Sequence, residues 1–356
     1  MIGNSRFQNA VKLFPQAVPP VWMMRQAGRY HQHYQKLRAR YSFAELCKKP
    51  EVAAEVALGP IDEFDFDVSI LFSDLLFPLE GLGMGLEYTD AGPRLGFSLT
   101  NETISRLRSV DEAFLDLDFQ GEAVTRTRSL LPDSKSLIGF VGGPWTLFVY
   151  AVEGGHAGNL IGSKTNEPLY HAFCEKMVPL LKKNIEMQLN AGCELVMIFD
   201  TAAGELSPGA YQRITAPHLK SLFDSFPGKI GYYSKGTQSS FFAGGLLSSP
   251  SLAGAGYDHR WDLPSVLKHR YQNSGRDING NSIFPNGFTQ GNFDQALLFL
   301  EPTAFERAMD DYLKPFLALS KDERAGWVSG LGHGVLPKTP EKNVKRFVQK
   351  VRETFA

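Results

Sequence analysis

Cysteine is scarce in this chain of 356 residues, and its three copies, Cys47, Cys174 and Cys193, lie far apart. An odd number without a Cys-x-x-Cys pair excludes a disulfide framework and a four-cysteine zinc site, and it fits a reducing compartment. His171 precedes Cys174 by three residues in a predicted helix, but no second Cys or His pair accompanies them at a zinc-like spacing. We therefore expect no bound metal ion.

Long apolar runs are also missing, although hydrophobic residues make up 43% of the chain. No stretch approaches the ~18 consecutive apolar residues that a membrane-spanning helix needs, and the N-terminus has no apolar signal core. The sequence therefore predicts a globular, cytoplasmic protein that has no membrane partner.

Acidic residues are absent from the first 44 positions, whereas the whole chain has 38 of them against 37 basic residues. The basic residues of this segment are Arg6, Lys12, Arg25, Arg29, Lys36, Arg38 and Arg40. Such a run is often a solvated arm or a nucleic-acid-binding tail. Here aromatic residues interrupt it, at positions 22, 30, 34 and 41, so we favour a folded anion pocket and no nucleic-acid partner.

Nucleotide and hydrolase motifs are missing as well. The glycines at positions 139, 142 and 143, like those near positions 81–85 and 330–334, match neither G-x-G-x-x-G nor a loop ending in G-K-[ST]. A G-x-S-x-G nucleophile elbow does not occur. These absences argue against a phosphate cradle and against Ser/His/Asp hydrolysis, and we expect no cofactor.

The most informative stretch that is present runs from position 22 to 30, Trp-Met-Met-Arg-Gln-Ala-Gly-Arg-Tyr. Residues 21–24 read as a short apolar strand, and Gly28 offers a backbone turn that other residues resist. Arg25 and Arg29 then lie on the loop that follows the strand. Because arginine is a planar fork of donors that stays charged, two such forks predict a ligand with more than one carboxylate.

Strands and helices alternate along the rest of the chain. Strands are predicted at 68–72, 136–141, 194–199, 229–233 and 326–331. Helices are predicted at 51–64, 111–131, from 144 onward, and at 167–190, 208–226, 263–270, 303–319 and 340–355. With no Pro-, Gly- or Ser-rich linker between halves, this pattern favours one α/β domain over 1–356, a (β/α)8 TIM barrel with its site at the C-terminal ends of the strands. A doubly wound sheet is the alternative, and 271–288 reads as an excursion loop.

Three further polar side chains, two at the ends of predicted strands and one within a predicted helix, are candidates for chemistry. Asp74 follows an apolar strand and precedes Leu-Leu-Phe-Pro, so its carboxylate is poorly hydrated unless it has a partner. It either caps a nearby helix or stabilises a developing cation. Tyr150 can donate its hydroxyl to a ligand, although a lone helical Tyr usually belongs to the core. His333, between two glycines, is accessible, although a lone His is more often structural.

Taken together, these motifs closely resemble the uroporphyrinogen decarboxylase family. The resemblance rests on the 20–30 run, on Leu-Phe-Ser-Asp-Leu at 71–75, on Gly-Pro-Trp-Thr at 143–146 with Tyr150, on Phe-Asp-Thr at 199–201 and on Gly-His-Gly at 332–334. It implies a (β/α) barrel, usually a homodimer, that removes carbon dioxide from the four acetate arms of uroporphyrinogen III, giving coproporphyrinogen III without a cofactor.

The resemblance also assigns roles to residues. Arg25 and Arg29 look like carboxylate-binding catalytic residues, with Arg25 a candidate proton donor, and Asp74 is similar to the aspartate that accepts the pyrrole N–H groups. The positions implied to contact substrate are Arg25, Gln26, Ala27, Gly28, Arg29, Asp74, Tyr150, Thr201 and His333, with Phe199 as an apolar wall.

The second half departs from the family pattern. Residues 231–256 are rich in Ser and Gly, and Asp258-His259-Arg260 stands where Asp-Trp-Arg is more usual. Two other functions stay open at this point. One is a zinc-dependent corrinoid or thiol methyltransferase of the same superfamily, which is expected to need a His-x-Cys pair that this chain lacks. The other is a tetrapyrrole-binding protein without turnover.

Overall fold

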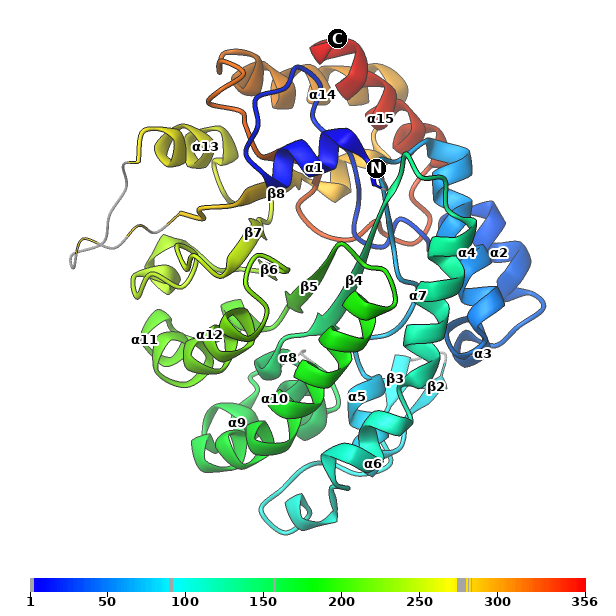
Figure 1. Ribbon diagram of the computed structural model, residues 1–356, viewed down its shortest axis with the longest axis vertical. Helices are drawn as coiled ribbons and strands as arrows, with labels where there is room; N and C mark the ends of the chain where they lie inside the picture. The colour runs from blue at the N-terminus through cyan, green and yellow to red at the C-terminus, as the bar shows by residue number, and fades with distance from the viewer. Residues whose placement is uncertain (1–2, 90–91, 156–157, 274–279, 281, 283) are drawn as a thin grey trace.

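The computed structural model describes residues 3–89, 92–155, 158–273, 280, 282 and 284–356. Seven parallel strands form one curled sheet in the order β1-β4-β5-β6-β7-β8-β9, and helices surround it (Figure 1). The strands are β1 Val68–Ile70, β4 Ser136–Gly142, β5 Leu195–Asp200, β6 Ile230–Ser234, β7 Leu252–Gly256, β8 Phe288–Phe293 and β9 Trp327–Leu331.

The gap between the last strand and the first is filled by one residue. Val21 makes a parallel bridge to Ser329 of β9. On its other side, the Val21 N–H donates to Asp67 Oδ2 (2.8 Å) and the Asp67 N–H donates to the Val21 carbonyl (3.0 Å). The sheet thereby closes into the (β/α) barrel that the sequence predicts, although the expected strand at 21–24 is reduced to this single bridge.

The helices vary widely in length. The α-helices are α1 Ser5–Val11, α2 Gln32–Arg38, α3 Phe43–Lys48, α4 Pro50–Phe64, α5 Phe77–Leu79, α6 Val110–Leu115, α7 Asp118–Leu130, α8 Pro144–Glu153, α9 Ile161–Lys164, α10 Glu167–Asn190, α11 Pro208–Ala210, α12 Ala216–Ser225, α13 Leu263–Tyr271, α14 Pro302–Leu317 and α15 Glu341–Phe355. A small antiparallel hairpin, β2 Glu87–Thr89 with β3 Gly92–Arg94, follows α5.

Several sequence predictions are confirmed, and others are wrong. Helix α10 has the predicted bounds, and proline opens α4 and α8 at the first turn, where its missing N–H is harmless. The predicted helix at 111–131 is two helices, because the chain breaks at Asp116 and Leu117. Likewise, 208–226 is not one regular helix, since α11 and α12 are joined by a wider turn at Tyr211–Thr215. The loop predicted at 271–288 lies partly outside the described residues.

Besides the β2–β3 hairpin, two strands of the barrel were missed; both contain glycine, and β8 also contains polar residues. Strand β7 reads Leu-Ala-Gly-Ala-Gly and β8 reads Phe-Thr-Gln-Gly-Asn-Phe, yet every residue of both is buried. Gly254 is needed there, because a Cβ on it would lie 2.3 Å from the Phe288 ring. The residues 231–256, which resemble a Ser- and Gly-rich loop, therefore contribute to two strands of the barrel.

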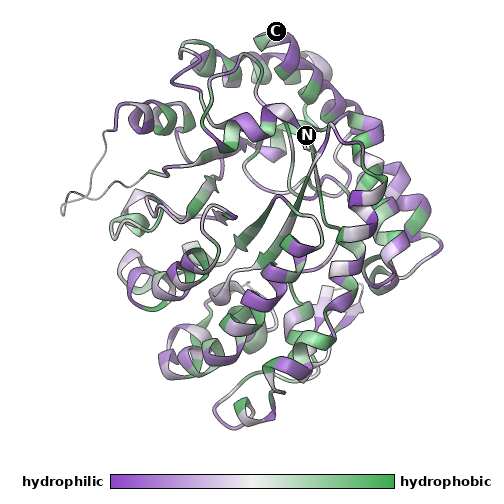
Figure 2. Ribbon diagram, viewed as in Figure 1, coloured by the Kyte–Doolittle hydropathy of each residue, from purple (hydrophilic) through white to green (hydrophobic). Residues whose placement is uncertain are grey.

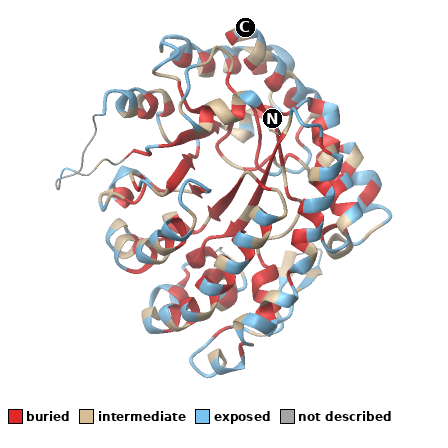
Figure 3. Cartoon of the chain, in the orientation of Figure 1, coloured by how far each residue is buried: buried red, intermediate tan, exposed pale blue. Residues whose placement is uncertain are grey.

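The barrel has two apolar layers. An interior cluster fills the space inside the sheet, and a larger cluster packs between the sheet and the outer helices; the strands are buried while the outer helix faces are exposed and hydrophilic (Figures 2 and 3). Phe7 and Ala10 of α1 join the interior cluster, and Phe7 packs on Phe288 at the start of β8 (ring centroids 6.3 Å). Helix α1 thus covers the N-terminal end of the barrel and leaves the C-terminal end for a site.

Candidate functional site

The loop that carries the two arginines starts at the barrel closure. Asp67, only 1% exposed, accepts hydrogen bonds from the Val21 N–H (2.8 Å) and from Asn4 Nδ2 (3.1 Å), and it pairs with Arg6 (3.2 Å). A buried carboxylate with this many donors is well stabilised. The loop therefore leaves the sheet from a fixed point.

The conformation of this loop differs from the sequence expectation in one respect. Arg25, not Gly28, has the left-handed backbone, with φ of 58°. A non-glycine residue held there costs about 1–2 kcal/mol, and such strain is concentrated at functional sites. The Gln26 side chain holds the turn: its Oε1 accepts from the Met23 N–H (3.3 Å) and its Nε2 donates to the Val68 carbonyl (3.0 Å).

Gln26 is fully buried, so its side chain serves the loop's own backbone. The Tyr30 hydroxyl donates to the Gln26 carbonyl (2.7 Å), which adds a second brace. Ala27 and Gly28 are half-buried between the two exposed arginines. A ligand contact at Gln26, Ala27 or Gly28 stays a prediction.

Arg25 lies across the segment that follows β9. The Val335 N–H donates to the Met24 carbonyl (2.9 Å), and a Cβ added to Gly334 would lie 2.5 Å from Arg25 Cδ. The absence of a side chain on Gly334 therefore makes room for the arginine. The first and the last motifs of the chain meet at this contact.

Asp74 lies four residues beyond the end of β1 and is partly buried. The Leu76 N–H donates to Asp74 Oδ1 (2.8 Å) in a local turn, but Leu76 is the N-cap residue of α5 and no side chain caps this helix, so the helix-capping alternative is wrong. Burial raises the pKa of Asp74, while the Leu76 amide, the Arg25 charge and the Tyr88 hydroxyl act in the opposite direction. The charge of Arg25 therefore acts directly on the Asp74 carboxylate.

Tyr150 joins this pair. It lies on α8, where burial raises the pKa of its phenol. The charge of Asp74 raises this pKa further, and the charge of Arg25 lowers it. Arg25 follows the bridge at Val21, Asp74 follows β1, and Tyr150 lies on the helix that follows β4. The structure brings these three predicted residues together at the C-terminal end of the barrel.

His333 lies next to Tyr233 of β6, in the segment that Arg25 contacts at Gly334. The Tyr233 hydroxyl donates to the Gly332 carbonyl (2.8 Å) and lies 3.3 Å from His333 Nδ1, with the two rings stacked at an interplanar angle of 4°. Phe199 packs between Tyr233 and Phe140 (centroids 6.1 and 5.6 Å) and belongs to the interior cluster. These rings form an apolar wall beside the arginine.

Arg29 and Thr201 are less closely connected to this group. Arg29 is exposed, and its charge lowers the pKa of Tyr34 in α2, which burial raises. Arg29 is not among the groups that shift the pKa of Asp74. Thr201 is half-buried and directly follows Asp200 at the end of β5. The structure puts both at the same end of the barrel, and their contact with a ligand stays a prediction.

A buried polar network supports the positions of Phe199, Thr201 and Tyr150. Asp200 Oδ1 accepts from the hydroxyl (2.6 Å) and the N–H (3.2 Å) of Thr146 in α8, and Oδ2 accepts from the Tyr232 hydroxyl (3.1 Å). Complete burial raises the pKa of Asp200 to about 6. This carboxylate ties the end of β5 to the first turn of α8.

Sequence reasoning missed Tyr88, Tyr233 and Asp200 as site residues. Tyr88 acts on Asp74 from the β2–β3 hairpin; its buried hydroxyl makes no hydrogen bond of ordinary geometry, so the two groups are near neighbours and not a tight pair. A tyrosine in a short polar hairpin gives no signal of this role. Tyr233 and Asp200 end predicted strands, and that position could have marked them.

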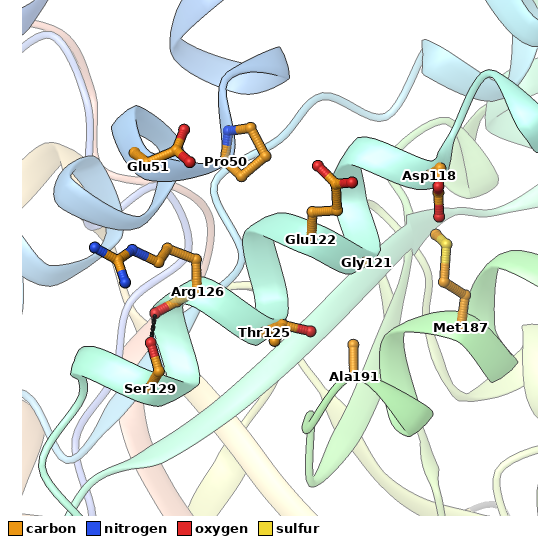
Figure 4. Close-up of a pocket in the computed structure, with 10 residues that line it drawn as sticks. All are labelled: Pro50, Glu51, Asp118, Gly121, Glu122, Thr125, Arg126, Ser129, Met187 and Ala191. Atoms are coloured by element: carbon orange, nitrogen blue, oxygen red, sulfur yellow. Dashed lines mark hydrogen bonds between the residues drawn. The ribbon is translucent and has the colours of Figure 1, made fainter.

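One surface hollow lies elsewhere, on the outer layer of helices (Figure 4). It has a volume of about 600 Å³ and lies between α4, α7 and α10, with Arg126 and Glu122 among its lining residues. None of the predicted site residues lines it. We therefore place the site at the C-terminal end of the barrel and not in this hollow.

Metal-ligating side chains and long apolar helices were both considered from the sequence, and the described residues can be compared with those expectations. Within the described part of the chain, no three or more His, Cys, Asp or Glu side chains are grouped as a metal ion would require. His171 is exposed and faces His218 (Nδ1 to Nε2, 3.3 Å), while Cys174 is buried. No helix among the described residues is both long and apolar enough to cross a membrane.

Known proteins resemble this chain over its full length. The chain is 34% identical to uroporphyrinogen decarboxylase of Myxococcus xanthus, covering 98% of this chain and 96% of that protein. It is 34% identical to a Thermus thermophilus protein of the same name (99% of both) and 36% identical to that of Koribacter versatilis (98% and 96%).

Solved structures confirm the fold alone. A methyltransferase from Methanosarcina mazei superposes over the whole of both chains with a TM-score of 0.71, at 17% sequence identity. A putative B12-independent methionine synthase from Listeria monocytogenes gives a TM-score of 0.52 at 12% identity, covering 96% of this chain and 98% of the other. At these identities, only the barrel architecture is shared.

The family model for uroporphyrinogen decarboxylase (URO-D) matches residues 3–354. Together with relatives that are more than 30% identical over nearly the whole chain, this match confirms the resemblance that the motifs indicate. The chain belongs to the uroporphyrinogen decarboxylase family.

Proposed function

We propose that this enzyme is a carboxy-lyase of haem biosynthesis, which removes carbon dioxide from the four acetate arms of uroporphyrinogen III and gives coproporphyrinogen III. The observation that carries the proposal is the grouping of Arg25, Asp74 and Tyr150 at one end of the barrel. This end is where barrel enzymes place their chemistry.

Binding relies on the arginine loop. The substrate bears eight carboxylates, and Arg25 and Arg29 are exposed guanidinium groups on one strained loop without an acidic neighbour in sequence. Each fork can bind a carboxylate through paired hydrogen bonds. The backbone of Ala27 and Gly28, between them, is accessible to the same arms.

The reaction needs a place for an electron pair. When the bond between the acetate methylene and its carboxylate breaks, carbon dioxide leaves and the electron pair moves into the attached pyrrole, which protonation has made electron-poor. A proton then adds to the methylene carbon to give a methyl group, and the ring proton is lost. The macrocycle thus acts as its own electron sink, and no cofactor enters the proposal.

Asp74 supplies the complementary charge. Its Oδ1 is anchored by the Leu76 amide, so the carboxylate is preorganised to accept the pyrrole N–H groups and to stabilise the cation. Removing one such preorganised group typically costs about 3 to 4 kcal/mol of transition-state stabilisation. Arg25, which shares its environment, is the candidate that delivers the proton.

The remaining contacts position the ring. Tyr150 and Thr201 offer hydroxyl donors, His333 offers an imidazole held by Tyr233, and Phe199 gives an apolar face on which the macrocycle packs. We also propose that residues 1–356 act as one domain and that the enzyme works in the cytoplasm as a homodimer, as its family resemblance implies.

The test is anaerobic incubation with reduced uroporphyrinogen III, followed by chromatographic counting of product carboxylates. Wild type should lose four carboxylates stepwise, and Asp74→Asn and Arg25→Ala should turn over at least ~100-fold more slowly. Arg307→Gln, a charge change on outer helix α14, is the matched control and should behave as wild type.

Other outcomes would favour the alternatives. Tight binding without release of carbon dioxide would indicate a tetrapyrrole-binding protein. Methyl transfer that depends on added zinc would favour the methyltransferase alternative, which the fold similarity suggests but for which the sequence has no His-x-Cys pair. Unchanged rates in both variants would refute the roles given to Asp74 and Arg25.

A further inference from the structure

The turn after β7 is the segment where the sequence departs from its family pattern, Asp258-His259-Arg260. It packs directly against the last site motif: a Cβ on Gly332 would lie 2.4 Å from the His259 N–H nitrogen. Gly332 is adjacent to His333. The turn is therefore in contact with the Gly-His-Gly segment on which Arg25 rests.

Asp258 holds this turn in place through buried hydrogen bonds. It is 1% exposed, its Oδ2 accepts from the Gly236 N–H (2.6 Å) and from Arg260 Nη1 (2.6 Å), and its Oδ1 accepts from the Arg260 N–H (3.0 Å). The Asp258 carbonyl also accepts from Asn292 Nδ2 (2.8 Å). A buried carboxylate that accepts three such hydrogen bonds holds its arginine partner in one orientation.

Arg260 itself is not buried. Its side chain is 49% exposed, and Asp258 takes only one of the terminal nitrogens. Guanidinium carries five N–H donors in a planar fork, so the remaining donors are available to a second acceptor. A buried acid that orients a half-exposed arginine is the arrangement expected of a preorganised carboxylate receptor.

Arg260 and Arg25 have one neighbour in common, Tyr233. The Tyr233 hydroxyl lies 3.3 Å from His333 Nδ1. Burial raises the pKa of Tyr233 and the charge of Asp258 raises it further, while the charges of Arg260 and Arg25 lower it. Arg25 approaches the Gly-His-Gly segment at Gly334 and the β7 turn approaches it at Gly332. Arg25 and the turn that carries Arg260 therefore contact the two glycines on either side of His333.

We propose that Arg260 binds a carboxylate arm of the substrate on the side of the site formed by Tyr233 and His333, and that Asp258 is the residue that positions it. This assignment rests on the proposed function, because it needs a ligand with carboxylates at several edges. A macrocycle with eight such arms meets that need, and arginines on one edge alone would leave the far arms without a partner.

The experiment measures KM and kcat for uroporphyrinogen III in Arg260→Gln, with Arg307→Gln as the matched surface control. Loss of one charge-assisted hydrogen-bonding partner should raise KM by about tenfold or more while kcat changes less than about threefold. The penalty should shrink for partly decarboxylated intermediates, which still carry acetate arms but have fewer carboxylates. A KM equal to that of the control would overturn the proposal.

A second variant covers the case in which Arg260→Gln leaves Asp258 buried without its partner and fails to fold. Arg260→Lys keeps the positive charge beside Asp258 but loses the planar fork, so its KM should rise above that of Arg307→Lys. Equal KM values in these two lysine variants would also overturn the proposal. Wild type that does not decarboxylate at all would instead refute the proposed function, so the two failures are distinguishable.

Discussion

Arg25 lies against Gly334, so closely that a methyl group on the glycine would come 2.5 Å from the arginine Cδ and 2.7 Å from its Cγ. The two residues belong to the first and the last motif of the chain. The exposed guanidinium therefore has its position set by the absence of a side chain at the opposite end of the sequence.

Gly334→Ala should displace Arg25 without harming the fold. Because misplacement of a catalytic group by about 1 Å can cost ~100-fold in rate, we expect turnover to fall about 10- to 100-fold. The free energy of unfolding should change by less than about 0.5 kcal/mol, since Arg25 is exposed. Gly244→Ala, where nothing lies within 4 Å of the added Cβ, is the control. Full activity in Gly334→Ala would contradict this view of the contact.

Tyr233→Phe should affect both stability and binding. It removes the hydroxyl that donates to the Gly332 carbonyl and that lies beside His333 Nδ1. Leaving a buried carbonyl without its donor costs about 1 to 3 kcal/mol, which urea unfolding can measure. Because the imidazole also loses its tether, KM should rise as well; an unchanged KM would mean that His333 does not need this tyrosine.

The pH dependence of turnover should reveal the environment of Asp74. Burial raises its pKa, so the ionised form is lost at a higher pH than for a free aspartate, and kcat/KM, which reports groups of the free enzyme, should fall on the acid side above pH 3.8. Arg25→Gln removes a charge that lowers this pKa, and should therefore move the acid limb of its residual kcat/KM to higher pH. A limb in the same place as that of Arg307→Gln would contradict the coupling.

Asp200 should make the protein less stable as the pH rises. Its pKa is raised from 3.8 to about 6, so the folded state binds more protons than the unfolded state between these values. Stability is then complete below about pH 4 and declines by up to about 3 kcal/mol by pH 6. In Asp200→Asn this decline should vanish, as the difference in urea midpoint between pH 4 and pH 7 would show. A wild-type decline retained in the variant would assign it to other groups.

The regular parts of the fold could be predicted because their signal is local. The apolar periodicity and the proline at the first turn define α10 and α4 within the sequence itself. Strands β7 and β8 give no such signal. Gly254 and Gln290 look like loop residues, and they are in strands only because Phe288 packs over the glycine and the barrel interior encloses the glutamine.

The site was predictable to the extent that it consists of residues at strand ends. Arg25, Asp74, Thr201 and His333 follow predicted strands and were therefore expected around one pocket. The structure links Arg25 to Asp74 by charge and to the segment of His333 by its contact with Gly334, and the contact of all four with a ligand stays a prediction. What sequence could not reveal is the set of tertiary partners. Tyr88 reaches Asp74 from a separate hairpin, and Arg25, not the expected Gly28, adopts the left-handed backbone because Gln26 binds Met23 and Val68.

The single bridge between Val21 and Ser329 joins residues that nearly the whole chain separates. The arginine loop leaves the sheet at that bridge, and Arg25 then lies against Gly334 beyond the last strand. The position of Arg25 therefore depends on β9 twice, once through the bridge and once through the glycine that follows the strand. A change that loosens the C-terminal strand is felt first at the arginine near the opposite end of the sequence.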